Sequence, residues 1–188
     1  MTLQPNQDLY TLIMSALQET GFTFLYKEEL DDSVLKTKGA LNINAELLLN
    51  DSDKLNLPLP LPYNGIEYSD VEINNFLDES IKNDLQPIII FGGNWCPDCR
   101  IFDGTLNMPS IKKFIDEKFR VLHIDVGRYD INMNLMELFG IPPEKGVPRV
   151  LVFDLERNLI NNSSTTEWTT ARDRDPQEIF NFIQTMAQ

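Results

Sequence analysis

The sequence predicts an α/β domain with a central mixed β-sheet flanked by helices, preceded by a mainly helical N-terminal extension. Helical and strand patterns alternate along the chain beyond residue 66, which is typical of an α/β sandwich. In that part, the apolar run from Ile88 to Phe91 is suited to a strand covered on both faces. Over residues 57–62 leucine and proline alternate, which blocks helix and favours an extended connector. We therefore expect an extension over 1–66, ending in this Pro-rich connector, and the α/β domain over 67–188.

The extension carries no motif that points to chemistry. Apolar residues at helical spacing after a polar start predict one amphipathic helix, over Leu9, Leu12, Ile13, Ala16 and Leu17. The cluster over 22–26 suits a strand or a docking segment, and 45–49 predicts another short helix. Because sixty such residues bury too little surface to be stable alone, we expect them to pack on the main domain or on a second subunit. The extension is therefore a candidate protein contact, and its Leu-Pro repeat would also suit a proline-binding partner.

Beyond the connector, each element is predicted from its hydrophobic period or its capping residues. In order, we expect a helix over 72–85, a strand over 88–91, a helix from the cysteines toward Leu106, a helix capped by Ser110, a strand over 121–126, a helix over 130–139, a hairpin of 149–153 with 159–160, and a last helix from Asp175.

Charge and hydropathy narrow the classes of function. The 188 residues include 29 acidic and 16 basic side chains, for a net charge of −13, which repels nucleic-acid phosphates and anionic lipids. No apolar run is long enough to span a membrane, and the first positive charge, Lys27, comes too late for a secretory signal. We expect no nucleic-acid partner, no membrane span and a cytoplasmic protein, or a periplasmic one if a targeting segment has been removed.

The only two cysteines, Cys96 and Cys99, are three residues apart. A disulfide that closes so small a loop adds little stability, so the pair is better explained by chemistry. A structural zinc site needs four ligands, and the chain offers one histidine besides these cysteines, so zinc would require two subunits to share the metal. We expect no metal and no other cofactor.

The pair stands where a buried strand gives way to a helix. A cysteine at a helix N-terminus faces unpaired backbone N–H groups and the positive end of the helix dipole, which stabilise its thiolate. We therefore expect Cys96 to be the nucleophile, and Cys99, one turn further into the helix, to resolve the mixed disulfide. This is the pattern of a dithiol–disulfide exchange site.

The stretch from Trp95 to Cys99, Trp-Cys-Pro-Asp-Cys, follows a hydrophobic strand, and Gly-Val-Pro at 146–148 precedes another. Over about residues 67–188 this combination resembles the thioredoxin superfamily, and within it bacterial proteins with the site Asn-Trp-Cys-Pro-Asp-Cys-Arg. The resemblance implies a thioredoxin-like fold. It also implies that Pro148 is a cis proline facing the cysteines and that Val147 offers backbone hydrogen bonds to a bound polypeptide.

Several positions depart from the family pattern or allow two interpretations. Thioredoxins keep a buried aspartate six residues before the first cysteine and a lysine beside it, where this chain has Ile90 and Val121. Loss of both charges together is coherent, because removing one would leave a buried charge unpaired, but proton transfer from Cys99 then needs another base or water. We interpret His123, inside a predicted strand, as structural rather than catalytic.

Around the cysteines, Trp95, Pro97, Asp98 and Pro148 are the expected supporting residues, and Trp95, Val147 and Pro148 the expected substrate-binding ones. Trp95 could serve as a substrate platform, but we expect it mainly to shield the cysteines. Asp98 should oppose thiolate formation by like-charge repulsion, with Arg100 as its expected counter-charge.

Together these features predict a protein thiol–disulfide oxidoreductase of the thioredoxin type, whose direction, as reductase, oxidase or isomerase, the sequence leaves open. The expected partners are a disulfide-containing protein or small thiol, together with an electron donor or acceptor. The alternative is a non-catalytic thioredoxin-fold redox sensor or protein-interaction module. Because every residue assigned to chemistry lies beyond the connector, we expect residues 67–188 to fold and remain active alone.

Overall fold

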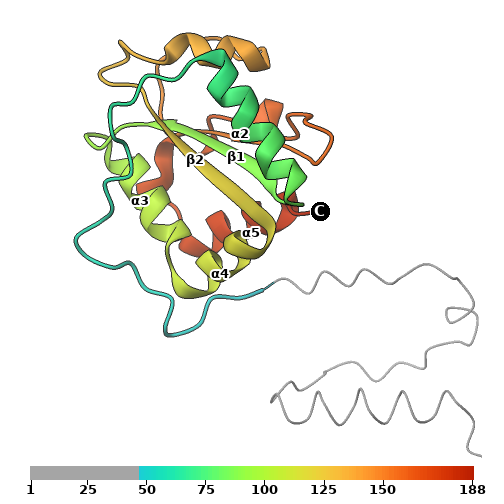
Figure 1. Cartoon of the computed structure of the whole chain (residues 1–188). Helices are drawn as coiled ribbons and strands as arrows, with labels where there is room; N and C mark the ends of the chain where they lie inside the picture. Colours follow the sequence, from blue (N-terminus) through green and yellow to red (C-terminus); the bar gives the residue numbers. More distant parts are fainter. Residues whose placement is uncertain (1–46) are drawn as a thin grey trace, which may run out of the picture. The chain divides into compact units, whose positions relative to one another are not determined.

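The computed structural model describes residues 47–188 (Figure 1). Its elements are, in order, α2 (Asp70–Lys82), β1 (Gln86–Gly92), α3 (Pro97–Leu106), α4 (Pro109–Lys118), β2 (Phe119–Asp125), the 3₁₀ helix η2 (Met133–Phe139), β3 (Arg149–Val152), the 3₁₀ helices η3 (Asn162–Ser164) and η4 (Glu167–Asp173), and α5 (Pro176–Met186). The predicted helix over 9–17 and the cluster over 22–26 lie outside the described residues. Within residues 47–188, no helix is long and apolar enough to cross a membrane.

The three strands form one mixed sheet in the order β2-β1-β3. The central strand β1 runs parallel to β2 and antiparallel to β3. In this register Ile90 lies between His123 on β2 and Val150 on β3. Every residue of β1 is buried, as the continuous apolar run predicts. The predicted α/β fold with a mixed central sheet is therefore confirmed.

Alternate residues of β1 contribute to two hydrophobic cores, because successive side chains of a strand point to opposite faces. Ile88 and Ile90 pack into a core with residues of α3, α4, α5 and η4. Ile89 and Phe91 belong to a second core with residues of α2 and η2, which also contains both cysteines. Figure 1 shows α2 on one side of the strands, and α3, α4 and α5 gathered on the other.

The helices α2 and α5 begin at capping boxes. Ser69 caps α2 together with Glu72, and Asp175 caps α5 together with Glu178. In each box the cap side chain accepts a backbone N–H of the first turn, while the glutamate accepts the N–H of the cap residue. The predicted start of the last helix at Asp175 is therefore confirmed.

The prediction that Ser110 caps α4 is wrong. The N-cap is Met108, whose side chain makes no capping bond, and Pro109 takes the first helical position. Because proline is favoured there, Ser110 falls inside the first turn. Its backbone N and its hydroxyl instead donate to the carboxylate of Asp53, each at 2.8 Å. A residue 57 positions away therefore supplies the missing cap.

Three local expectations were wrong or only partly right. Instead of an α-helix over 130–139 there is the shorter 3₁₀ helix η2, which starts after Asn132 because that residue has a positive φ of 56°. Residues 47–49 are not helical. The predicted hairpin is reduced to one bridge between Phe153 and Leu159 and a hydrogen bond from Ile160 N to Val152 O.

The Pro-rich connector lies against α3. Leu55 and Leu59 crowd Gly104 so closely that a β-carbon there would lie 3.0 Å from a methyl group of each. The carbonyl of Leu59 also accepts a hydrogen bond from the Arg100 guanidinium at 3.1 Å. The part of the extension that the structure describes thus packs on the main domain, while the boundary after residue 66 stays a prediction.

Candidate active site

The two cysteines lie at the N-terminus of α3, immediately after the central strand. Cys96 is the N-cap, with extended backbone, and its sulfur accepts a hydrogen bond from Cys99 N at 3.1 Å. The two cysteines are not joined by a disulfide in this structure, and both are buried. Their placement at a strand-to-helix junction, which the sequence predicted, gives the Cys96 sulfur the free N–H groups of the first helical turn.

The surroundings shift the pKa values of the two thiols in opposite directions. The hydrogen bond from the Cys99 thiol, with backbone N–H groups of Cys99 and Asp98, lowers the pKa of Cys96 to about 7, although burial and the Asp98 charge oppose this. The same thiol–thiol hydrogen bond, together with burial, raises the pKa of Cys99 well above its usual range. At neutral pH Cys96 is thus partly thiolate, and Cys99 holds its proton.

The loop before β3 lies against the cysteines, and its Val147–Pro148 peptide bond is cis, as the resemblance implied. The Cys96 thiol donates to the carbonyl of Val147, with sulfur and oxygen 3.5 Å apart. Gly146 has a φ of +121°, a conformation that favours glycine at this position. The structure therefore brings Val147 and Pro148 to the cysteines.

Trp95 is half-buried beside Cys96 and is fixed by three contacts. Its indole N–H donates to the carbonyl of Gly127. The Arg128 guanidinium lies 4.9 Å from the centre of the indole ring, and Tyr129 meets the ring edge-on at 5.4 Å. A side chain held on several sides in this way suits the shielding role better than a mobile platform.

Asp98 is buried and paired, but not with the predicted partner. Its carboxylate lies 3.1 Å from the Arg172 guanidinium and accepts the backbone N–H of Arg172 at 3.0 Å. Arg100 points elsewhere, toward the carbonyl of Leu59, because residues two apart on a helix do not share a face. Pro97, between Cys96 and Asp98, is exposed at the first helical position.

Sequence reasoning assigned no role to Tyr63 or Asp103 and read His123 as structural. Tyr63 is buried beside Gly92 and the cysteines, and Asp103 lies one helical turn beyond Cys99. The Nε2 atom of His123 lies 2.7 Å from a carboxylate oxygen of Asp103. The four-residue spacing of Cys99 and Asp103 was a usable signal, whereas nothing in the sequence pointed to Tyr63.

Over residues 47–188, no group of three or more His, Cys, Asp and Glu side chains is arranged to hold a metal ion. The site itself consists of two sulfurs, a cis-proline loop, an indole and buried polar side chains. These groups suit sulfur exchange, because one thiol is activated and the second lies within reach of it.

Comparisons with known proteins agree with this geometry. A family model described as thioredoxin-like matches residues 77–154. A thioredoxin of Rickettsia bellii (strain RML369-C) is 28% identical over 106 residues, which make up 53% of this chain and 93% of the relative. The solved structure of a disulphide isomerase from Xylella fastidiosa Temecula1 superposes with a TM-score of 0.61 at 29% identity, over 68% of this chain and 97% of that one.

Residues 77–154 match the thioredoxin-like family, and the relative and the solved structure support membership of the thioredoxin superfamily. The predicted family and fold are thereby confirmed, and the relatives support thiol–disulfide oxidoreduction as the general activity. The narrower resemblance, to bacterial proteins with an Asn-Trp-Cys-Pro-Asp-Cys-Arg site, stays a prediction. In this thioredoxin-fold domain, the positions where the family keeps a buried aspartate and lysine are the apolar residues Ile90, fully buried in β1, and Val121, in β2.

Proposed function

We propose that this protein is a thioredoxin-type thiol–disulfide oxidoreductase with Cys96 as nucleophile and Cys99 as resolving cysteine. The observation that carries the proposal is the position of Cys96 as the N-cap of α3, where its sulfur accepts a hydrogen bond from Cys99 N at 3.1 Å, and the opposite shifts of the two thiol pKa values agree with it. The lower pKa supplies a thiolate for attack at neutral pH. The higher pKa keeps the second thiol protonated until a mixed disulfide has formed.

In the reducing direction the reaction has two steps. The Cys96 thiolate attacks one sulfur of the substrate disulfide, so that a bond forms between Cys96 and that sulfur while the other sulfur leaves as a thiolate. Cys99 then loses its proton and attacks Cys96, and the substrate's second sulfur leaves with the bonding electrons. The protein is oxidised to a Cys96–Cys99 disulfide, and an electron donor must reduce it before the next cycle.

The proposed substrate is a disulfide-containing protein or a small thiol compound, and an electron donor or acceptor completes the cycle. Val147 and Pro148 lie beside Cys96, where a polypeptide could form backbone hydrogen bonds with Val147, and Trp95 borders the same sulfur. Pro97 and Asp98 support the site by starting α3 and by carrying the charge nearest the sulfurs. Both a cytoplasmic and a periplasmic setting are compatible with this chemistry.

A turnover assay tests the activity. Reduced protein is mixed with insulin in the presence of excess dithiothreitol, and disulfide reduction is compared with dithiothreitol alone and with a Cys96→Ser, Cys99→Ser double variant. We expect each protein molecule to reduce many insulin disulfides, and the double variant to match the background. A single stoichiometric oxidation without turnover would instead favour the redox sensor.

The reduction potential of the Cys96–Cys99 couple decides the direction. A value near about −270 mV would mark a reductase, and one near about −120 mV an oxidant of other proteins. An isomerase falls between these, near about −180 mV. Equilibration of the protein with glutathione buffers of known ratio, followed by mass spectrometry of alkylated thiols, gives this value.

A further inference from the structure

The second step of the proposed reaction needs Cys99 to lose a proton that its surroundings hold tightly. In the reduced protein the hydrogen bond to Cys96 and burial raise the pKa of Cys99 well above the usual range, and the burial of Cys99 remains once Cys96 has reacted. Once Cys96 is in a mixed disulfide, its sulfur is no longer an anion that could take this proton. Attack by Cys99 therefore requires a base within the protein or water that reaches the buried sulfur.

Tyr63 belongs to the same buried cluster as Cys99. The side chain is only 4% exposed, and its hydroxyl has no hydrogen-bond partner among residues 47–188. It occupies space that only glycine leaves free, because a β-carbon at Gly92 would collide with the phenol ring and its oxygen. Burial raises the pKa of Tyr63 well above its usual value, and the charges of Cys99 and Asp103 raise it further.

Asp103 and His123 form a buried pair beyond the phenol. Asp103 follows Cys99 by four residues, so the two side chains lie on the same face of α3. One carboxylate oxygen is 2.7 Å from His123 Nε2, and the Asp103 side chain is 5% exposed while that of His123 is 20% exposed. The rings of Tyr63 and His123 meet edge-on with their centres 5.5 Å apart. Tyr63 thus neighbours His123, and His123 pairs with Asp103, so the three side chains form a row on the side of α3 that carries Cys99.

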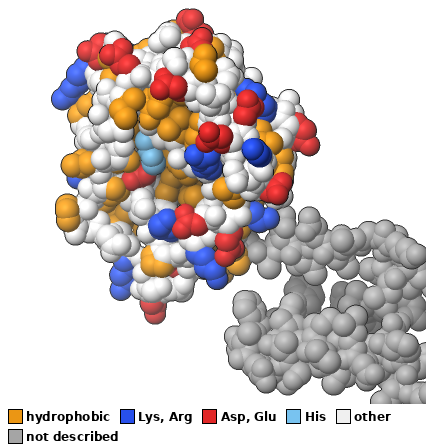
Figure 2. Space-filling model, in the orientation of Figure 1, with side chains coloured by type: hydrophobic (Ala, Val, Ile, Leu, Met, Phe, Trp, Pro, Cys, Tyr) orange, Lys and Arg blue, Asp and Glu red, His pale blue; other side chains and the backbone are white. Residues whose placement is uncertain are grey.

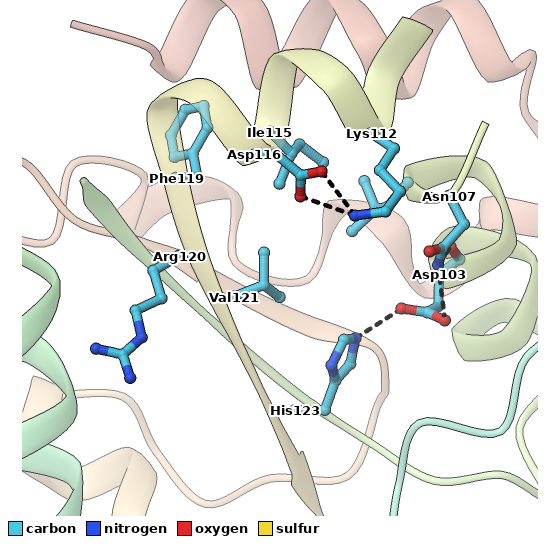
Figure 3. Close-up of a pocket in the computed structure, with 10 residues that line it drawn as sticks. Asp103, Asn107, Lys112, Ile115, Asp116, Phe119, Arg120, Val121 and His123 are labelled. Carbon is cyan, nitrogen blue, oxygen red and sulfur yellow. Dashed lines mark hydrogen bonds and ion pairs between the residues drawn. The ribbon is translucent and has the colours of Figure 1, made fainter. Parts of the chain in front are cut away.

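The outer end of this row opens into a pocket. Asp103 and His123 line a cavity of about 310 Å³, and Figure 3 shows the two side chains pointing toward each other at its wall, with Lys112 and Asp116 opposite. In Figure 2 the single histidine, coloured pale blue, reaches the molecular surface among hydrophobic side chains. Water in this pocket can therefore exchange protons with the pair.

We propose that Tyr63, Asp103 and His123 relay the proton of Cys99 to the pocket during the resolving step. This inference rests on the proposed function. The Tyr63 hydroxyl accepts the proton from Cys99 as it passes its own proton to the neighbouring Asp103–His123 pair, and the pair passes one proton to water. The Cys99 thiolate then attacks Cys96, the bond between Cys96 and the substrate sulfur breaks, and that sulfur leaves with the electron pair. His123 thereby acts as a positioning residue for Asp103.

Other charged and titratable groups surround the relay and enter its pH dependence. The groups from the elements packed against it are Cys96, Asp98 and Cys99 at the start of α3, Lys112 and Asp116 on α4, and Arg120 on β2.

A two-phase reaction separates the resolving step from the first attack. Reduced protein is mixed with dithiobis(nitrobenzoate), a disulfide that releases a coloured thiolate each time one of its sulfurs is displaced. Cys96 attack gives the first release and leaves a mixed disulfide, and attack by Cys99 gives the second release. Both rates are followed by stopped flow across pH in the wild type, Tyr63→Phe and Asp103→Asn.

We expect Tyr63→Phe and Asp103→Asn each to slow the second release at pH 7 by about tenfold or more, the scale of general acid–base assistance. Without the relay the proton must go to hydroxide, so the rate of the second release should climb with pH and approach the wild-type value. The first release should change less than the second. Tyr68→Phe, a half-buried tyrosine on the same core cluster, is the matched control and should keep the wild-type profile.

A second release that is unchanged in both variants would overturn the relay. A second release that is slowed equally at every pH would also overturn it, because a packing defect slows the reaction without depending on hydroxide. If one of the two variants folds poorly, the rate of the second release in the other variant still tests the relay. Failure of the proposed function gives a different result. The wild type would then release only one coloured thiolate per protein, and mass spectrometry would show the nitrobenzoate group still attached to it.

Discussion

Asp98 is the charged residue whose carboxylate acts on the Cys96 thiol. Its charge raises the pKa of Cys96, against the hydrogen bonds that lower it. A buried carboxylate of this kind is costly unless paired, and Arg172 from η4 supplies both a guanidinium and a backbone N–H. The pairing explains how a carboxylate can be buried beside a thiolate.

Asp98→Asn keeps the size of the side chain and its acceptor for Arg172 N while removing the charge. We expect the pKa of Cys96 to fall by less than about one unit, because Arg172 already offsets part of the repulsion. By stabilising the reduced form, the substitution should also make the disulfide more oxidising. Titration of the thiolate by its ultraviolet absorbance measures the first effect, and a glutathione equilibrium the second.

Arg172→Gln should change the pKa of Cys96 in the opposite direction. It removes the guanidinium that pairs with Asp98, so the pKa of Cys96 should rise. Arg174→Gln, two residues further on and paired with Glu178, should leave that pKa unchanged. A pKa of Cys96 that stays the same or rises in Asp98→Asn would contradict the repulsion between the Asp98 carboxylate and the Cys96 thiolate.

Helix α4 depends on a capping group outside its own sequence. Asp53 accepts from Ser110 N and from the Ser110 hydroxyl, at the helix N-terminus where Met108 offers no acceptor. Burial raises the pKa of Asp53, but hydrogen bonds from Asn50 and Ser110 outweigh this and hold it below its ordinary value of 3.8. By capping the N-terminus of α4, Asp53 holds the residues before the connector against the main domain.

Removing this cap by Asp53→Ala should lower the free energy of unfolding by about 1 kcal/mol at pH 7. Because the folded pKa is depressed, the contribution of the carboxylate is present above pH 3.8 and is lost as pH falls below it, so the difference from wild type should shrink in acid. Urea unfolding at both pH values measures this. Asp51→Ala, a nearby exposed carboxylate, is the control, and an equal effect there would argue against a specific cap.

The same elements show how far sequence reasoning reaches. The strand from Ile88 to Phe91 was predictable, because burial on both faces leaves an apolar run that is visible locally. Ser110 looked like a cap for the same local reason, but proline at the first helical position moved the helix start and a distant carboxylate took over.

The candidate site also has one part that the sequence predicts and one part that only the fold reveals. The motif from Trp95 to Cys99 lies within one short segment, so the sequence predicted it. The cluster of Tyr63, Asp103 and His123 combines residues from the connector, α3 and β2, so only the fold brings it together. His123 was interpreted as structural because it lies inside a predicted strand.

At the scale of the molecule, the connector behaves as part of the domain surface. Tyr63 lies in the core with the cysteines, and Asn94, just before the site, exchanges hydrogen bonds with the backbone of Tyr63. The expectation that residues 67–188 suffice on their own stays a prediction, and these contacts of Tyr63 indicate what such a shortened chain would lose.

We expect a chain that begins at residue 47 to keep its stability and its exchange rate. A chain that begins at residue 67 should lose about 3 kcal/mol or more of unfolding free energy, the scale of deleting a buried aromatic side chain, and should resolve mixed disulfides slowly. Urea unfolding and the two-phase thiol assay compare the two truncations. Equal behaviour of both would show that the connector contributes neither packing nor chemistry.

The assignment of nucleophile and resolving cysteine is tested most directly by trapping. Cys99→Ser and Cys96→Ser variants are incubated with a disulfide-containing protein, and the covalent species are identified by mass spectrometry. We expect Cys99→Ser to accumulate a mixed disulfide through Cys96. The Cys96 thiolate can still attack the substrate, but no second thiol is present to displace the substrate from Cys96. Cys96→Ser should accumulate almost none, since the remaining thiol of Cys99 is fully buried. Equal trapping by the two variants would contradict the central claim.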